Sequence, residues 1–250
     1  MRRLKESLPD RQQITKHLGS GDFFVWECYG KGLLGRIQAW IFTSRLEAVV
    51  AFLESSKSEP RMILDVGCGP MFMAYPLLQR STSQYVGVDI LSSAALRKYK
   101  HAFKNLGMGS LEVIRASAQS LPFRNGTFDL LLCLDVLEHL EEPKKASAEM
   151  NRTAESGASI LVSLPLENWL QKLSRIGFVW MRLLGEPTAT RIGHIPIMQT
   201  PEYHYAGDIK SHKQMRDELT SHLQLLGTKY TPTGLFKWFN INSIHMFRKR

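Results

Sequence analysis

Between residues 61 and 165, five short apolar runs alternate with stretches of helical character, and this alternation restricts the fold more than any other feature. The runs span residues 61–66, 85–90, 111–116, 128–135 and 158–165. A helix between the last two runs is expected to begin near Pro143, because proline is tolerated in the first turn of a helix. Runs as apolar as these are typical of strands that are covered on both faces. We therefore predict a Rossmann-like, doubly wound α/β fold with a mostly parallel sheet.

Segments on either side of these runs also have helical patterns. Apolar residues recur at intervals of three and four from residue 32 to residue 54, which predicts an amphipathic helix in an N-terminal helical extension over residues 1–60. The main domain then covers residues 61–250. Within it, residues 166–210 combine an aromatic-rich helical stretch with a long irregular segment, and we expect them to form a helical cap facing the substrate. A further helix and two β-like runs are predicted over residues 209–227, 228–235 and 239–249.

The composition is that of a globular protein, with 44% hydrophobic and 22% charged residues in a chain of 250. The formal net charge of +9 is concentrated in the last third, where twelve Lys and Arg residues stand against six Asp and Glu residues. Such an excess suits an anionic substrate, a phospholipid surface or RNA, or it is simply a solvated basic surface. Three cysteines without metal-ligand spacing, and no secretory or membrane-spanning run, predict a cytoplasmic protein with reduced thiols and no metal site.

The sequence DVGCGP forms the turn after the first predicted strand, where a parallel α/β sheet binds its ligand. Gly67 and Gly69 allow the backbone to turn sharply and to approach a ligand closely. Asp89 ends the second predicted strand, where a carboxylate can accept both hydroxyls of an adenosine ribose. Phe72 stands where a dinucleotide site needs a third glycine, and Asp65 adds a negative charge that disfavours phosphate. A cationic or zwitterionic nucleoside such as S-adenosylmethionine therefore suits this turn better than a dinucleotide.

Four segments resemble the successive motifs of class I S-adenosylmethionine-dependent methyltransferases: ILDVGCGPMFMA, YVGVDI, AQSLPFRNGTFDLLLCLDVLEHLEEP and ASILVSLP. They are most similar to the type 11 group, which includes the quinone-biosynthesis methyltransferases. The resemblance implies the seven-stranded sheet of that class and S-adenosylmethionine as the cofactor. In this family the DVGCG loop holds the methionyl part, and the acid after the second strand holds the ribose. The cofactor-binding residues so implied are Asp65, Gly67, Cys68, Gly69, Asp89, Ile90, Ser117, Ala118 and Leu134.

The sequence departs from the family pattern where the adenine amino group is usually read. Ser117 stands in place of the expected aspartate, and Gln119 in place of a common glutamate. A serine hydroxyl still accepts a hydrogen bond but lacks charge assistance. Adenine recognition is therefore expected to be shared with backbone groups such as those of Ala118.

Two histidines are candidate general bases. His139 follows the fourth predicted strand, and His204 lies in the string PEYHYAGD before a predicted helix. An imidazole with a pKa near neutrality can accept a proton from an acceptor that must lose one. For His139 the alternative is a structural role in orienting its loop. For His204 the alternative is a surface turn in which Asp208 caps the following helix.

These features predict a methyltransferase that transfers a methyl group by in-line displacement to a small-molecule or lipid-linked acceptor. Such a displacement needs positioning rather than a fixed nucleophile or a metal. The aromatic and basic residues of the expected cap suit an apolar pocket, or a peripheral contact with an anionic membrane. Two alternatives stay open: an RNA methyltransferase, suggested by the charge but without a base-flipping motif, and a non-catalytic cofactor-binding regulatory protein, suggested by Met71 and Ser117. The oligomeric state is not indicated.

Overall fold

The computed structural model describes residues 8–20, 22–29, 32–56, 59–79, 81–166, 208–234 and 240–250. Within these residues seven strands form one sheet in the order β3-β2-β1-β4-β5-β7-β6. The strands are β1 (Met62–Val66), β2 (Gln84–Asp89), β3 (Leu111–Arg115), β4 (Phe128–Leu134), β5 (Ala154–Pro165), β6 (Leu223–Thr231) and β7 (Asn242–Lys249). The first five are parallel, and β7 is antiparallel to both β5 and β6. The predicted fold class is confirmed. The strand order switches between β1 and β4, so a ligand site is expected at their carboxyl ends.

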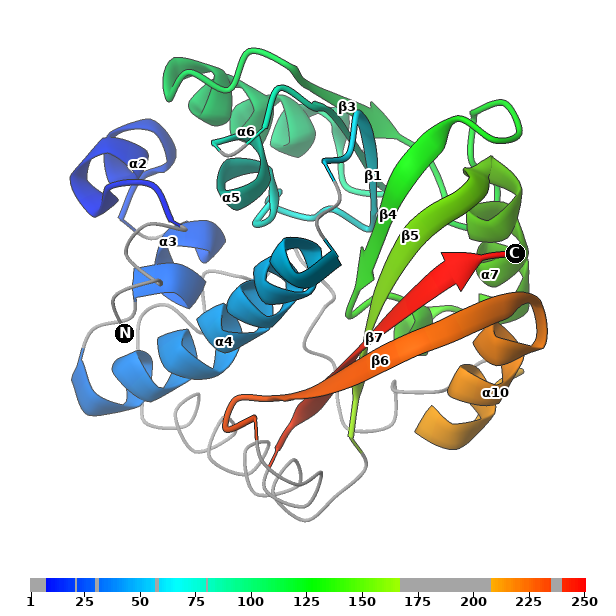
Figure 1. Ribbon diagram of the computed structural model, residues 1–250. Coiled ribbons are helices and arrows are strands. Elements are labelled where there is room, and N and C mark those ends of the chain that lie inside the picture. Colours follow the sequence, from blue (N-terminus) through cyan, green and yellow to red (C-terminus); the bar gives the residue numbers. More distant parts are fainter. Residues whose placement is uncertain are drawn as a thin grey trace.

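Helices cover both faces of this sheet (Figure 1). Residues of the N-terminal helices and of α5 and α6 share one hydrophobic core with the sheet, and residues of α7 and α10 share the other. The first group comprises α2 (Arg11–Leu18), α3 (Phe23–Tyr29), α4 (Gly32–Ser56), α5 (Ala74–Leu78) and α6 (Ser93–Asn105). The second group comprises α7 (Pro143–Thr153) and α10 (His212–His222), and a short 3-10 helix, η1 (Leu137–His139), follows β4. A sheet covered in this way has strands that are apolar on both sides, as the sequence indicated.

The N-terminal extension is helical, and its main helix lies close to where the sequence predicts it. Helix α4 covers the expected 32–54 and extends to Ser56. The shorter helix α2 begins at an N-cap, Asp10, whose carboxylate accepts the amide N–H groups of Gln12 and Gln13 at 2.9 and 3.0 Å. From α4, Leu46 and Val49 pack in the same buried cluster as Ile63 of β1. The extension is therefore part of the sheet's own core.

The helix predicted over residues 209–227 is wrong over residues 223–227. Helix α10 ends at His222, and β6 begins at Leu223, because this segment pairs with β7 from Leu223 onward. Strand pairing here overrides a helical apolar pattern. The N-cap of α10 is Ser211, whose hydroxyl accepts the N–H of Gln214 at 3.2 Å, so the expected cap at Asp208 is also wrong.

Two backbone hydrogen bonds fix the chain on either side of residues 167–207, which lie outside the described residues. Leu166 donates its N–H to the carbonyl of Ile241 at 2.7 Å, directly after β5. Asp208 donates its N–H to the carbonyl of Glu141 at 3.0 Å, just after η1. Both bonds lie at the carboxyl ends of the parallel strands. Almost all of the expected cap, with its aromatic stretch and His204, falls in the part that is not described. No helix among the described residues has the length and apolar character needed to cross a membrane.

Candidate functional site

The glycine turn after β1 presents its backbone at the carboxyl end of the sheet. Gly67 and Cys68 both donate their N–H groups to the carbonyl of Val88, at 2.7 and 3.0 Å, which binds the turn to the end of β2. Gly67 has φ +71°, and a Cβ there would lie 2.2 Å from a methyl carbon of Val136. Gly69 has φ +47°, and no described atom would lie within 4 Å of a Cβ placed on it. The first glycine is required by close packing, and the second borders open space.

Asp89 connects this turn to the end of β2. One carboxylate oxygen accepts the N–H of Gly69 at 2.7 Å, and the other accepts the N–H of Leu91 at 2.9 Å. The residue is half-buried. The next residue, Ile90, is 71% exposed although it is a large apolar residue. A carboxylate beside an exposed aliphatic side chain and open space suits a ribose with its attached base.

Asp65 and Cys68 lie beneath the turn. Asp65 is 4% exposed and accepts a hydrogen bond from the hydroxyl of Tyr85. Burial raises the pKa of Asp65 to about 7. The Cys68 thiol is buried against Gly87, where a Cβ would lie 2.7 Å from the sulfur, and burial raises the pKa of this thiol. Only the backbone of Cys68 is therefore placed to contact a ligand in the turn.

Ser117 and Ala118 lie in the loop after β3, beside the end of β2. The amide of Ala116 donates to the carbonyl of Asp89 at 3.1 Å. The hydroxyl of Ser117 accepts the N–H of Gln119 at 3.2 Å, and Ser117 forms an isolated β-bridge with Ser120. Ala118 is buried. The loop thus runs next to Asp89, where the base of a bound nucleoside would extend.

The end of β4 carries a charged arrangement that was not predicted. After Leu134, Asp135 has φ +57°, a conformation uncommon for a residue with a Cβ. Its N–H donates to the hydroxyl of Ser163 at 2.8 Å, and this hydroxyl donates to a carboxylate oxygen of Asp135 at 2.6 Å. The other carboxylate oxygen forms an ion pair with Arg45 of α4. Arg45 also donates to the side-chain oxygen of Asn242 at 3.0 Å, so one guanidinium joins α4, β4 and β7.

No local signal in the sequence identifies the Arg45 arrangement. Arg45 follows the polar residues Thr43 and Ser44 on a long helix, and its partners come from distant parts of the chain. Its guanidinium lies 4.7 Å from the ring centroid of Phe42, an arrangement typical of a cation–π contact. A non-glycine residue with positive φ at the switch point is the kind of strain that clusters at functional sites.

Glu138 and His139 follow in η1. Glu138 is 1% exposed, one of its carboxylate oxygens has no hydrogen-bond partner among the described residues, and burial raises its pKa to about 8. His139 is exposed, yet neighbouring groups shield its ring enough for desolvation to lower its pKa. His139 is therefore at the expected edge. His204, the other candidate base, lies outside the described residues.

Other polar groups lie away from this edge. His245 is 1% exposed and donates to or accepts from Ser243 and Thr228 at 2.9 Å each, beneath α10, where burial and the neighbouring His212 lower its pKa to about 3. Within the described ranges no group of three or more His, Cys, Asp or Glu side chains could hold a metal ion. A surface hollow of about 290 Å³ contains none of the expected residues and is lined by Gln13, Lys16, His17, Tyr75, Asn105 and Leu106.

The residues at the carboxyl edge fit the cofactor that the sequence suggests. A carboxylate beside a glycine turn can hold ribose hydroxyls, and the open side of Gly69 leaves room for the chain attached to the ribose. At this edge of a basic protein Asp135 is paired with Arg45, and burial raises the pKa of Asp65 and of Glu138, so Asp89 is the carboxylate that a ligand in the turn meets. Such an environment favours a sulfonium or an ammonium group over a pyrophosphate.

Part of the chain is similar to known methyltransferases. Residues 64–162 match the family model of a methyltransferase domain. An uncharacterized methyltransferase of Mycobacterium sp. (strain KMS) is 34% identical over 127 residues, which cover 49% of this chain and 47% of the relative. The ubiquinone/menaquinone biosynthesis C-methyltransferase UbiE of Haemophilus ducreyi is 27% identical over 172 residues, covering 66% and 63%. The chain thus spans between about half and just under two thirds of the length of these curated relatives.

A solved structure supports the fold. The magnesium protoporphyrin IX methyltransferase ChlM from Synechocystis PCC 6803, which has S-adenosylhomocysteine bound, superimposes with a TM-score of 0.61. The alignment covers 96% of this chain and 100% of that chain, at 20% sequence identity. Likeness at that identity concerns the arrangement of the elements and not the acceptor.

Proposed function

Residues 64–162 match the family model of a methyltransferase domain, and from this likeness we propose that the protein transfers a methyl group from S-adenosylmethionine to a small-molecule or lipid-linked acceptor. The observation that carries the proposal is Asp89, whose carboxylate meets the N–H of Gly69 at 2.7 Å beside the open side of the glycine turn. A ribose seated there has its hydroxyls at the carboxylate and its 5′ chain over the turn.

The chain's own residues then have distinct binding roles. Asp89 binds the ribose, the exposed Ile90 contacts the base, and the loop of Ser117 and Ala118 reads its polar edge. The backbone of Gly67, Cys68 and Gly69 binds the methionyl part, with Asp65 beneath it. Leu134, which is partly exposed at the end of β4, forms a wall next to the reacting groups.

The bound cofactor supplies an activated methyl group on a sulfonium, so the protein mainly has to orient the acceptor and exclude water. His139 serves as the base for acceptors that must lose a proton. Desolvation lowers its pKa, which favours the neutral imidazole, the form that can accept a proton. His204 is the second candidate base, as the sequence analysis expects. Arg45, Asp135 and Ser163 place α4 against the ends of β4 and β5, beside the acceptor's expected position.

The acidic character of the edge also bears on the acceptor. A polyanion such as RNA would bring its phosphates toward the carboxylate of Asp89 beside the turn. Met71, which gave a reason to doubt catalysis, is fully buried with φ +59° and donates its N–H to the carbonyl of Cys68 at 2.7 Å. Its side chain therefore leaves the turn accessible. A small or lipid-linked acceptor remains the proposal, and RNA and a non-catalytic role are outcomes of the test.

The cofactor site is tested by calorimetric titration of S-adenosylhomocysteine into the wild type and Asp89→Ala. We expect the substitution to weaken binding by at least tenfold while the circular dichroism spectrum stays unchanged, because the ribose and the turn both lose their partner. Glu112→Ala is the matched control, since it removes an exposed carboxylate from neighbouring β3 that pairs with Lys100 and Lys104. Equal affinity in Asp89→Ala and the wild type would show that the site is assigned wrongly.

The reaction itself is tested with methyl-labelled S-adenosylmethionine and a panel of quinols, amines, lipid extracts and RNA. Label in a small-molecule or lipid fraction is the expected outcome. Label in RNA would support the second enzyme hypothesis. Tight cofactor binding without transfer to any acceptor would support a regulatory protein.

A further inference from the structure

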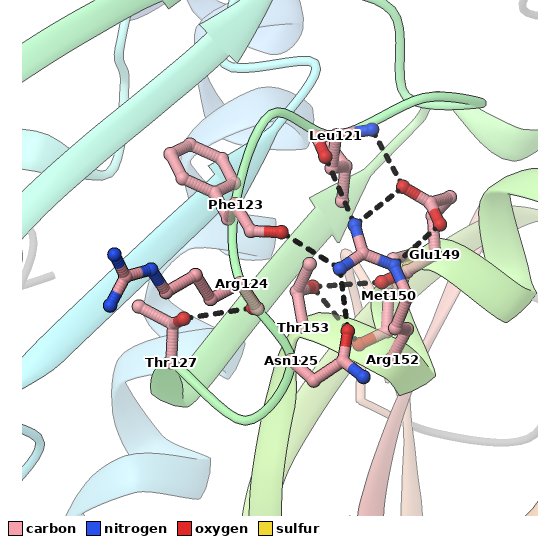
Figure 2. Close-up of polar contacts among 9 residues, drawn as sticks. All are labelled: Leu121, Phe123, Arg124, Asn125, Thr127, Glu149, Met150, Arg152 and Thr153. Atoms are coloured by element: carbon pink, nitrogen blue, oxygen red, sulfur yellow. Dashed lines mark hydrogen bonds and ion pairs between the residues drawn. The ribbon is translucent and has the colours of Figure 1, made fainter.

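One guanidinium of α7 binds three acceptors in the loop that follows β3. Arg152 donates to the carbonyl of Phe123 at 2.7 Å, to the side-chain oxygen of Asn125 at 2.9 Å and to the carbonyl of Leu121 at 3.0 Å. Figure 2 shows the guanidinium enclosed by the loop, with these acceptors arranged around it. Each bond is charge-assisted, and the planar guanidinium fixes several acceptors at once.

Glu149 completes the arrangement from one turn earlier in α7. Its two carboxylate oxygens accept from Arg152 Nε and Nη2 at 2.7 and 2.8 Å. One of them also accepts the N–H of Leu121 at 2.7 Å. We refer to Arg152 and Glu149 together as the loop clamp, because they bind both the donor and the acceptor of the Leu121 backbone. Hydrogen bonding to Arg152 lowers the pKa of Glu149, which keeps this carboxylate charged.

The clamped loop begins with Ser117 and Ala118, the residues expected to read the adenine. The Ser117 hydroxyl already accepts a backbone hydrogen bond from Gln119 and offers no negative charge. Recognition of the base then depends on where the loop backbone lies. If backbone groups of this loop bind the base, the loop must already be ordered before the ligand binds. Ordering the loop during binding would lower the affinity.

We propose that Arg152 is a positioning residue for base recognition: through the loop clamp it holds the Ser117–Ala118 backbone where it reads the adenine edge, which makes the cofactor site selective for adenine without the usual acid. This inference rests on the proposed function. It assigns no contact between Arg152 and the cofactor. The loop residue nearest to Ala118 that the guanidinium binds is Leu121, three positions further along the chain.

The test compares two ligands that differ only in the base, S-adenosylhomocysteine and S-inosylhomocysteine. For the wild type we expect a clear preference for the adenine ligand. For Arg152→Gln we expect about tenfold weaker binding of the adenine ligand and little change for the inosine ligand, so that the preference largely disappears. A merely structural role would lower the melting temperature and leave the ratio of the two dissociation constants unchanged, which would overturn the proposal.

Arg124→Gln is the matched control, because it removes the same charge from the same loop. Its side chain points away from the clamp in Figure 2. Its backbone carbonyl accepts a hydrogen bond from the hydroxyl of Thr127 at 2.8 Å, which the substitution leaves in place. We expect this variant to retain the wild-type preference. If Arg152→Gln fails to fold, Asn125→Ala decides, since it removes one clamp bond from an exposed residue and should reduce the preference about twofold to threefold. An unchanged preference in Asn125→Ala would then overturn the proposal. Failure of the wild type to bind either ligand would instead refute the proposed function.

Discussion

Asp65 lies directly before the glycine turn, and the fold changes its chemical state. From the sequence it is a negative charge that would repel phosphate. In the structure it is buried, bonded to Tyr85, and close to half protonated at neutral pH because burial raises its pKa to about 7. The exclusion of phosphate therefore depends more on Asp89 at the surface than on Asp65 beneath it. The sequence identifies this residue as an aspartate, and its burial in the fold determines what fraction of it is charged at neutral pH.

The raised pKa of Asp65 predicts a pH dependence of stability. Between the unfolded value near 4 and the folded value near 7, the folded state retains a proton that the unfolded state has lost, so this residue reduces the free energy of unfolding as the pH rises. Asp65→Asn removes that contribution. In urea denaturation from pH 5 to pH 7, the free energy of unfolding of Asp65→Asn should rise relative to that of the wild type by about 1 kcal/mol per pH unit. A difference that does not vary with pH would contradict the prediction.

The position of the glycine turn and of Asp89 at the strand ends was predictable, whereas the partners of Arg45 were not. Gly67, Gly69 and Asp89 can be recognised because they come at or directly after the ends of apolar runs. The parallel pairing of those strands then brings them to the same edge of the sheet. Arg45 depends on Asp135 and Asn242, which come to it only when the sheet is complete. Short-range sequence patterns carry no information about contacts between residues that are so far apart in the chain.

At the scale of elements, helix α4 packs against the turn that follows β1. Its Phe42 ring packs against Phe72 with centroids 4.3 Å apart, and Phe72 also stacks on Phe24 of α3 at 5.1 Å. Phe72 occupies the position of the third glycine of a dinucleotide site. There, the glycine lets the next helix pack tightly beneath a pyrophosphate. Here the aromatic side chain joins the N-terminal helices to the turn instead.

The ion pair of Arg45 and Asp135 should be a measurable part of this attachment. We expect Arg45→Met to lower the free energy of unfolding by about 2 kcal/mol, less than for a fully buried pair because the two side chains are 17% and 29% exposed. Methionine keeps most of the apolar stem, and Asp135→Asn keeps a residue that tolerates positive φ. A double-mutant cycle in urea should give a coupling energy of about 1 kcal/mol. Arg36→Met, on an exposed position of the same helix, should change stability by less than about 0.5 kcal/mol.

At the scale of the whole molecule, the division into an N-terminal extension and a main domain stays a prediction from the sequence. The fold class was predictable because five apolar runs with helical connections admit few arrangements. The error over residues 209–227 arose where β6, the edge strand, is defined by its pairing with β7 rather than by its own pattern. A single buried cluster runs from the N-terminal helices into the sheet.

That shared core predicts one cooperative transition. Leu46→Ala, at a 4% exposed position of α4, should lower the free energy of unfolding of the entire protein by about 3 kcal/mol. Far-ultraviolet circular dichroism and tryptophan fluorescence should report coincident urea transitions in both the wild type and the variant. Two separated transitions, with only the first affected by the substitution, would show instead that residues 1–60 unfold on their own.

The bonds from Leu166 to Ile241 and from Asp208 to Glu141 have an evolutionary consequence. Both join main chain to main chain, so neither depends on which side chains lie between them. If the cap expected over residues 166–210 faces the substrate, as the sequence predicts, the acceptor can change through substitutions, insertions or deletions in that segment while the two attachment points stay the same. The half of the protein that grips the nucleoside would be inherited unaltered.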